Sequence, residues 1–303
     1  MRWLPLILVA TLVAGCNATR PAPQTTASPE SPLSPIVAQP VLLASAPVVS
    51  QRAYAAIVVD AKSGKILHET SARSLRYPAS LTKMMTLYLL FEQLESGRLT
   101  VRSPLTVSEE AASRPPAKIG VKAGTAITVD TAIRALAVRS ANDVAVVVAE
   151  NLSGSEEAFA LAMTRKARAI GMRQTTFVNA SGLPDPRQVS TAQDMAVLGR
   201  ALSDRFPRYF RYFSTPEFTF NNRKWRNTNK LLKTVDGVDG IKTGYIRASG
   251  SNLTASVRRD GKHLIAVVIG AKSGTARNKK MTELIEEYLP EASGSGLLGL
   301  SLF

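Results

Sequence analysis

Short runs of apolar and β-branched residues, joined by loops that contain glycine, lie near both ends of the long central part of the chain, and apolar residues keep helical spacing between these ends. Residues 54–59 and 65–68, joined by a short loop that contains glycine, are typical of a β-hairpin. A second hairpin is predicted from residues 251–257 and 263–269. Strands from both chain ends and helices from the middle predict an α/β (α+β) fold. In it an antiparallel sheet is built from both chain ends, flanked by helices and joined to a mostly helical insert.

Helical spacing dominates from residue 130 to residue 206. Ser153 and Ser190 each stand three residues before Glu or Gln, which matches the capping box at a helix start. Pro207 should end the last helix of this region. A further helix with one apolar face is predicted near the C-terminus, where Pro290 should end it.

The most apolar helix of the pattern begins at residues 78–83. Ser80 and Lys83 are three residues apart and therefore point to the same side of this helix. Because the helix is apolar nearly all round, it should lie in the interior. A lysine carried there loses water, which lowers its pKa towards the value that a general base needs. Ser80 and Lys83 are therefore a candidate nucleophile and base, although a serine at a helix start is also an ordinary cap.

Composition limits the chemistry that the chain can perform. Its 303 residues, 45% of them hydrophobic, can bury a full core in one or two domains. The single cysteine, Cys16, excludes an intrachain disulfide, and His68 and His263 are the only histidines. We therefore expect no metal site built from thiolate or imidazole ligands, and no cofactor. The net charge of +15 favours anionic surfaces such as phospholipid head groups or cell-wall polymer. The sequence has no nucleic-acid-binding motif, so nucleic acid is not an expected partner.

The first 50 residues have the composition of a leader and a tether. Residues 1–15 contain one basic residue, an apolar run and small residues, as in a secretion signal, and are too short to span a bilayer. Residues 13–16, Val-Ala-Gly-Cys, resemble the lipobox of bacterial lipoproteins, which implies that Cys16 is lipidated. Seven prolines follow within residues 17–50, a composition that cannot build a core. The expected domains are a signal peptide at 1–15, a Pro-rich tether at 16–50, a folded domain at 51–290 and a frayed or docked tail at 291–303.

Two further short motifs follow Ser80 and Lys83 along the chain. Ser140-Ala141-Asn142 lies between two predicted helices, where Ser-x-Asn by itself is typical of a helix cap. The sequence at 242–244, Lys-Thr-Gly, precedes the last hairpin and by itself predicts a strand end or a turn at the surface. Together and in this order, the three motifs are the set found in penicillin-binding proteins and class A β-lactamases.

The likeness extends beyond these motifs. Residues 140–143, 177–183, 190–194, 237–245 and 270–277 resemble stretches of the low-molecular-mass D-alanyl-D-alanine carboxypeptidases. These are penicillin-binding serine peptidases of the serine β-lactamase-like superfamily. The resemblance covers about residues 51–290. It implies a β-lactamase/transpeptidase-like fold, peptidoglycan stem peptides as substrates and β-lactam antibiotics as inhibitors.

The resemblance also implies a role for each matching residue. Ser80 attacks the carbonyl of the penultimate D-alanine of a stem pentapeptide, the terminal D-alanine leaves, and water hydrolyses the acyl-enzyme. Lys83 takes the serine proton, and a nearby Lys242 should lower the pKa of Lys83 further by like-charge repulsion. Ser140 relays the proton to the leaving amine, while Asn142 holds Lys83 and the substrate amide in place.

The remaining matched positions are expected to bind the substrate. The backbone N–H groups of the nucleophile and of Tyr245 form the oxyanion hole, at which a helix start adds favourable charge. Thr243, Lys242 and Arg277, beside Gly244, match the positions that anchor the terminal carboxylate.

Some features depart from the family. Ile246 and Ser251 stand where Thr and an aromatic residue are more frequent, which affects the edge of the cleft rather than the reaction. The sequence ends after the last predicted helix, where many relatives continue into a β-rich domain and an amphipathic membrane-binding helix. A lipid at Cys16 would replace that anchor, and Asn17 after it indicates the outer membrane by the sorting rule of diderm bacteria. We therefore expect an exported, periplasmic, lipid-anchored protein.

Three alternatives to a carboxypeptidase stay open. A D,D-endopeptidase would use the same machinery on peptidoglycan crosslinks. A class A-like β-lactamase needs a glutamate that activates the deacylating water, and residues 177–188 contain none. The protein could also be an inactive wall-binding lipoprotein, although the intact motifs argue against this.

Overall fold

The computed structural model of the chain describes residues 49–294. The predicted signal peptide, the lipidation site Cys16, most of the tether and the last nine residues lie outside the described residues. Within the described part, no helix is long and apolar enough to cross a membrane.

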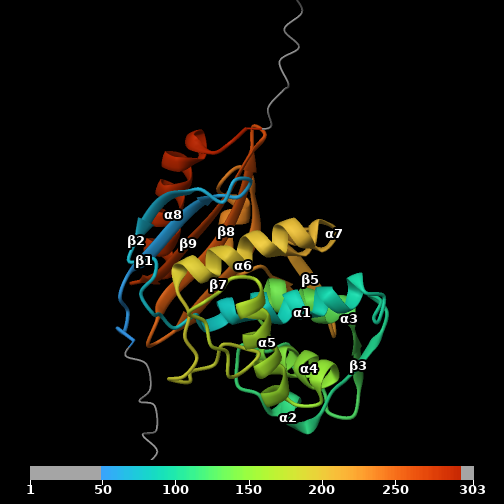
Figure 1. Ribbon diagram of the computed structural model, residues 1–303. Helices are drawn as coiled ribbons and strands as arrows, with labels where there is room; N and C mark the ends of the chain where they lie inside the picture. Colours follow the sequence, from blue (N-terminus) through green and yellow to red (C-terminus); the bar gives the residue numbers. More distant parts are fainter. Residues whose placement is uncertain (1–48, 295–303) are drawn as a thin grey trace, which may run out of the picture. The chain divides into compact units, whose positions relative to one another are not determined.

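One five-stranded antiparallel sheet unites the two ends of the described chain (Figure 1). Its strands are arranged in the order β2-β1-β9-β8-β7. Their bounds are β1 (Ala55–Asp60), β2 (Ile66–Thr70), β7 (Val238–Ile246), β8 (Gly250–Arg259) and β9 (Lys262–Ala271). Because β1 pairs with β9 from the Ala55–Ile269 pair to the Asp60–Leu264 pair, strands from opposite ends of the chain are neighbours. The predicted fold class is therefore confirmed.

Helices cover both faces of the sheet and build the insert (Figure 1). The α-helices are α1 (Lys83–Glu95), α2 (Glu109–Ser113), α3 (Val129–Arg134), α4 (Asn142–Ser153), α5 (Glu156–Ala169), α6 (Ala192–Arg205), α7 (Pro207–Phe210) and α8 (Gly274–Tyr288). Shorter turns of 3-10 or π type are η1 (Ala79–Thr82), η2 (Ala135–Arg139), η3 (Arg211–Ser214), η4 (Lys230–Lys233) and η5 (Leu289–Glu291). Two small two-stranded antiparallel sheets complete the fold, β3 (Pro104–Thr106) with β4 (Ala126–Thr128), and β5 (Glu217–Phe220) with β6 (Arg223–Arg226).

The alternation of side chains along β1 explains the layers. Ile57 and Val59 face a large core that also contains the apolar residues of α1 and α6. Ala56 and Val58 point the other way, into a smaller core closed by α8. Every residue from position 83 to position 91 of α1 is buried, so the prediction of an interior helix is confirmed.

Two predicted helix starts are wrong by one or two residues. Ser155, rather than Ser153, caps α5 and accepts the N–H three residues later. The reason is that α4 runs to Ser153 and ends at Gly154, which has a left-handed φ of 80°. Thr191, rather than Ser190, caps α6, because Ser190 is held in an extended bridge to the preceding part of the chain.

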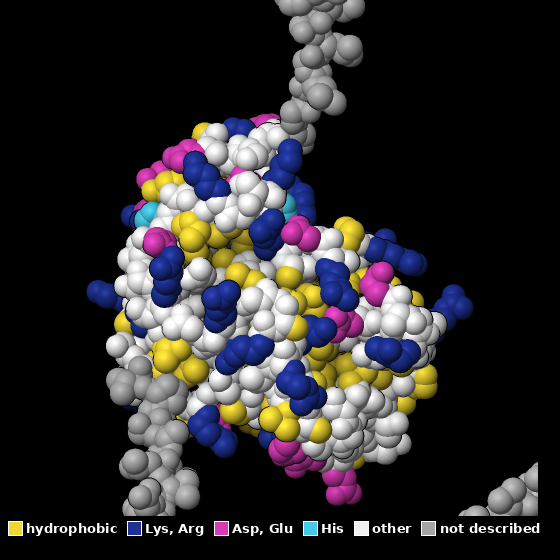
Figure 2. All heavy atoms as spheres, viewed as in Figure 1, with side chains coloured by type: hydrophobic (Ala, Val, Ile, Leu, Met, Phe, Trp, Pro, Cys, Tyr) yellow, Lys and Arg dark blue, Asp and Glu magenta, His cyan; other side chains and the backbone are white. Residues whose placement is uncertain are grey.

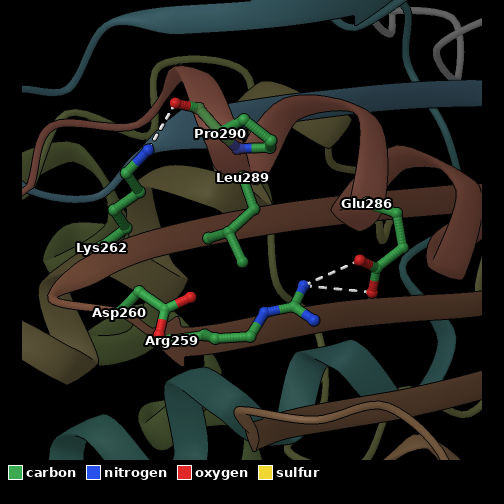
Figure 3. A pocket seen from close by; sticks show the side chains of 6 residues that line it. All are labelled: Arg259, Asp260, Lys262, Glu286, Leu289 and Pro290. Atoms are coloured by element: carbon green, nitrogen blue, oxygen red, sulfur yellow. Dashed lines mark hydrogen bonds and ion pairs between the residues drawn. The ribbon is translucent and has the colours of Figure 1, made fainter.

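The end of the described chain is docked against the sheet. The Ser293 hydroxyl donates to Asp60 Oδ2 at 2.6 Å. Burial would raise the pKa of Asp60, but hydrogen bonds from Ser293 and Ser63 outweigh it and lower this pKa to about 2. Lys262 Nζ also donates to the carbonyl of Pro290 at 2.5 Å (Figure 3). Of the expected tail, residues 291–294 are therefore docked rather than frayed.

Positive charge is spread widely over the surface. Lysine and arginine side chains are distributed over the whole face drawn in Figure 2 instead of gathering over one element. This distribution accompanies the net charge of +15. This dispersed charge attracts anionic surroundings in general. It does not by itself mark a specific anion-binding site.

Candidate active site

Ser80 lies in a tight turn that feeds directly into the buried helix α1. The preceding residue, Ala79, has a φ of 48°, a left-handed conformation that costs energy for a residue with a side chain. Two glycines let other segments approach this turn. A β-carbon at Gly182, whose φ is 85°, would overlap the carbonyl oxygen of Ala79. One at Gly244 would lie 3.2 Å from the backbone nitrogen of Ser80, so β7 and the loop around Gly182 both press against the nucleophile.

Lys83 is fully buried beneath Ser80. Its Nζ lies 3.3 Å from Ser80 Oγ, and it donates to Asn142 Oδ1 at 2.8 Å and to the carbonyl of Ser181 at 2.5 Å. A neutral amine has two N–H donors and one lone pair. Two carbonyl-type acceptors use both donors, which leaves the lone pair for the hydroxyl of Ser80. The geometry therefore suits a base rather than an ion-paired cation.

The pKa of Lys83 agrees with this geometry. Burial lowers this pKa well below its ordinary value, and the charge of Lys242 lowers it further, against the opposing charges of Asp143 and Glu156. These are the two causes that the sequence predicted, with burial the larger. Both favour the neutral amine that proton abstraction requires.

Ser140 and Asn142 come from the junction between η2 and α4. Ser140 has a left-handed φ of 64°, which ends the helical turn and aims its side chain at the cleft. Its Oγ is buried and has no hydrogen-bond partner within residues 49–294. Asn142 Nδ2 donates to the carbonyl of Pro115 at 3.1 Å, which orients its Oδ1 towards Lys83. The Ser140 hydroxyl is thus free to bond a substrate.

Asp143 fixes this wall of the cleft from behind. Its carboxylate is fully buried and accepts the backbone N–H groups of Ile119, Gly120 and Val121 at 3.1, 2.8 and 3.3 Å. The bonds tie the start of α4 to the loop that contains Pro116 and Ala117, two residues that line the cleft.

The opposite wall is strand β7. Lys242 lies in the middle of this nine-residue strand and is 1% exposed, so the prediction of a surface strand end or turn is wrong. The hairpin partner β8 pairs with β7 along its whole length, and η1 covers it from the other side, which explains the burial. Burial and then the charge of Arg277 lower the pKa of Lys242 to about 7. Thr243 Oγ1 lies 2.8 Å from Thr228 Oγ1.

Arg277 reaches the cleft from the first turn of α8. Its Nη1 donates to the carbonyl of Asn252 at 3.3 Å, and burial lowers its pKa to about 10. No carboxylate pairs with it in the described part of the chain. The guanidinium keeps donors for an anionic ligand.

These walls enclose a hollow of about 360 Å³. Its lining residues are Ser80, Pro116, Ala117, Arg139, Ser140, Asn142, Gly182, Leu183, Thr228, Thr243, Gly244, Tyr245, Ile246 and Arg277. The predicted site residues within the described chain thus come together, with Lys83 and Lys242 buried beside the hollow. Tyr245 is 62% exposed at the rim. Ile246 borders the hollow and Ser251 does not, so only the first departure from the family bears on the edge of the cleft.

Several lining or supporting residues received no role from the sequence, among them Ser181, Gly182, Thr228 and Arg139. Ser181 acts through its backbone carbonyl, which no side-chain pattern reveals. Gly182 lies inside residues 177–183, which resemble the family. The need for glycine at this position follows only from its close contact with the turn that contains Ser80. Thr228 and Arg139 lie in segments whose approach to the cleft depends on tertiary packing.

A second hollow of about the same volume has different chemistry. It lies between the β8–β9 turn and the end of α8 (Figure 3). Arg259 there pairs with Glu286 at 3.0 Å, and Lys262 is bonded to a carbonyl, so its cations are already satisfied. The residues that line it include no serine, cysteine or threonine nucleophile. Among residues 49–294 there is also no group of three or more His, Cys, Asp or Glu side chains that could hold a metal ion.

Comparison with known proteins agrees with this geometry. Residues 41–273 match the model of peptidase family S11, described as D-alanyl-D-alanine carboxypeptidase. The D-alanyl-D-alanine carboxypeptidase DacC of Escherichia coli is 37% identical over 247 residues, which cover 79% of this chain and 61% of the relative.

Solved structures are similar as well. Penicillin binding protein 5 from Haemophilus influenzae has a TM-score of 0.75 and 33% identity, over 80% of this chain and 71% of that one. Penicillin-Binding Protein D2 from Listeria monocytogenes, solved in a cefotaxime-bound form, has a TM-score of 0.67 and 30% identity, over 79% and 97% of the two chains. The chain spans about three fifths of the length of the first curated relatives that it matches. It belongs to the D-alanyl-D-alanine carboxypeptidase family of serine peptidases.

Proposed function

We propose that this protein is a serine-type D-Ala-D-Ala carboxypeptidase that removes the terminal D-alanine from peptidoglycan stem pentapeptides. The observation that carries the proposal is the position of Lys83. Its Nζ is 3.3 Å from Ser80 Oγ, and its two N–H donors are occupied by Asn142 and Ser181. A desolvated amine held in this way takes the proton of a serine hydroxyl, which makes Ser80 a nucleophile.

The reaction then proceeds in two halves. Ser80 Oγ attacks the carbonyl of the penultimate D-alanine while Lys83 takes the hydroxyl proton. Backbone N–H groups of Ser80 and Tyr245 stabilise the oxyanion, and the proton passes through Ser140 to the nitrogen of the leaving D-alanine. When the C–N bond has broken, an ester to Ser80 remains. Water hydrolyses this ester with the same base, which restores the serine.

The terminal carboxylate of the substrate is anchored by Thr243, Lys242 and Arg277. Arg277 supplies donors that no carboxylate of the described chain uses. Lys242 has a pKa of about 7 in the unliganded site. A bound carboxylate raises that pKa and favours the charged lysine, so substrate binding strengthens its own anchor.

β-Lactam antibiotics are the expected inhibitors, since they would acylate Ser80 in place of the peptide. The cefotaxime-bound relative at 30% identity supports this. Slow release of the antibiotic follows from the lining of the hollow, which includes no Asp or Glu. Both carboxylate oxygens of Glu156, a partly buried acid behind the site, are engaged by the N–H of Ala180 and by Arg114. A penicillin-binding protein is thus favoured over a β-lactamase.

Purified muropeptides test the proposal and separate it from endopeptidase activity. Incubation with a stem pentapeptide, followed by mass spectrometry, should show loss of one D-alanine. A crosslinked dimer in the same assay should stay largely intact. If the dimer is split while the pentapeptide persists, the protein is an endopeptidase.

We propose further that the protein is an exported lipoprotein of the periplasm, anchored to the outer membrane through Cys16. The support is the lipobox-like sequence at residues 13–16, the signal-peptide composition of residues 1–15 and the proline-rich stretch at 16–50. A Cys16→Ala variant should move from the membrane fraction to the soluble periplasmic fraction and still be labelled by penicillin. Membrane association equal to that of the wild type would count against the anchor.

A further inference from the structure

The hollow contains a second guanidinium that the proposed reaction does not use. Arg139 is the last residue of η2, directly before Ser140, and lines the same hollow as Arg277. Two arginines and no carboxylate among the lining residues create a site with an excess of positive charge. A ligand that matches it carries more than one anionic group.

The side chain of Arg139 lacks the polar partners that three nearby arginines have. Arg114 pairs with Glu156, Arg134 with Asp130, and Arg168 donates to two backbone carbonyls. The side chain of Arg139 has no ion pair or hydrogen bond to any residue from 49 to 294, and its Nε is buried without a partner. A guanidinium in that state retains its donor capacity for a ligand.

An aromatic platform holds Arg139 in place. Its guanidinium carbon lies 4.8 Å from the centroid of the Trp225 ring, and Arg223 stacks on the same ring at 3.9 Å. Trp225 is itself buried, on β6. Stacking restrains a guanidinium without using its in-plane N–H groups, so Arg139 is preorganised to bind a carboxylate.

The two arginines serve different parts of the hollow. Arg277 comes from α8, bonds to β8 and is the neighbouring charge that lowers the pKa of Lys242. Arg139 comes from the insert and rests on β6. The loop after β6 connects the strand of Trp225 to the cleft. In this loop the Thr228 N–H donates to the carbonyl of Val138 at 3.2 Å, and the Thr228 hydroxyl is hydrogen-bonded to the Thr243 hydroxyl.

We infer that Arg139 is a specificity-determining residue that binds a second carboxylate of the substrate, on the residue that precedes D-Ala-D-Ala. The inference rests on the proposed function, which gives the terminal carboxylate its own anchor at Thr243 and Arg277. The other negative charge must then come from the acyl part of the peptide. A diaminopimelate residue with a free side-chain carboxylate provides it, whereas the amidated form does not.

Two stem pentapeptides that differ only in this carboxylate, free or amidated, test the inference. The wild type should show a kcat/KM for D-alanine release that is about tenfold or more higher for the free form, as expected for one charge-assisted bidentate contact. In Arg139→Gln this ratio should fall to about one. Arg139→Lys keeps the charge but loses the planar guanidinium that binds a carboxylate through two N–H groups, so it should give an intermediate ratio. Arg223→Gln is the matched control, because Arg223 stacks on the same ring but does not line the hollow, and should keep the wild-type ratio.

The results distinguish a failure of the role of Arg139 from a failure of the proposed carboxypeptidase function. A wild type that releases D-alanine equally fast from both peptides overturns the role of Arg139, whether or not its variants fold. An unchanged ratio in Arg139→Gln does the same, and shows that Arg139 only packs against Trp225. A wild type that is labelled by penicillin but releases D-alanine from neither peptide overturns the proposed carboxypeptidase function, and the inference with it.

Discussion

Replacement of Ser80 by alanine should abolish covalent labelling by fluorescent penicillin and lower D-alanine release by about 10³-fold or more. The Ser80 oxygen is the only protein atom of the proposed mechanism that forms a covalent bond with a carbon of the substrate, and alanine cannot form an acyl-enzyme. Labelling is measured on a gel and D-alanine by mass spectrometry. Labelling equal to that of the wild type would show that another residue is the nucleophile.

The fold should survive this substitution. Ser80 Oγ makes one long contact with Lys83, at 3.3 Å, so its loss should change the free energy of unfolding by no more than about 1 kcal/mol. Ser96→Ala is a suitable control, because Ser96 follows the other end of α1, is exposed, and bonds only locally to the carbonyl of Gln93. That variant should be labelled as fast as the wild type.

Replacement of Lys83 by methionine should slow acylation by penicillin by about 10³-fold or more. Methionine fills nearly the same volume but has no lone pair that accepts the proton of Ser80. The variant leaves Asn142 Oδ1 and the Ser181 carbonyl without their donor, which should cost about 1–3 kcal/mol in the free energy of unfolding. Thermal unfolding and the second-order acylation rate measure the two effects separately. A rate within a few-fold of the wild type would remove Lys83 from the role of base.

The pH dependence of the acylation rate is a second test of whether Lys83 is the base. Because burial and Lys242 lower the pKa of Lys83, the wild-type amine is neutral at pH values where an ordinary lysine is charged. The wild-type rate should therefore be retained well below pH 10 and fall as the pH drops through the lowered pKa. The residual rate of Lys83→Met should lack this acidic limb. If the limb persists unchanged in the variant, another group controls it.

The sequence predicted the parts of the fold that depend on local patterns. Both predicted hairpins, β1–β2 and β8–β9, follow from strand-forming runs joined by loops that contain glycine, and the burial of α1 follows from its uniformly apolar composition. The strand that carries Lys242 was harder to find, because β7 contains two interior glycines, a lysine and a threonine instead of alternating apolar residues. Its place between β8 and the Ser80 turn, rather than its own composition, makes it a buried strand.

In the candidate site, too, the residues set by local patterns could be predicted, and those set by tertiary contacts could not. Helical spacing places Lys83 beside Ser80, and the later motifs supply Asn142 and Lys242. The partners of Lys83 could be read only in part, since the Ser181 acceptor is a backbone carbonyl. Arg139 could not be found at all, because its position depends on stacking against Trp225, 86 residues further along the chain.

The most direct test of the account is to map the adduct that benzylpenicillin forms with the wild-type protein. Mass spectrometry of a proteolytic digest should find one penicilloyl group, on Ser80, and the adduct on the intact protein should persist long after excess antibiotic is removed. An adduct on a different residue, or no adduct, would contradict the assignment of Ser80. Rapid loss of the adduct, with hydrolysis of benzylpenicillin at many turnovers per second, would make the protein a β-lactamase instead.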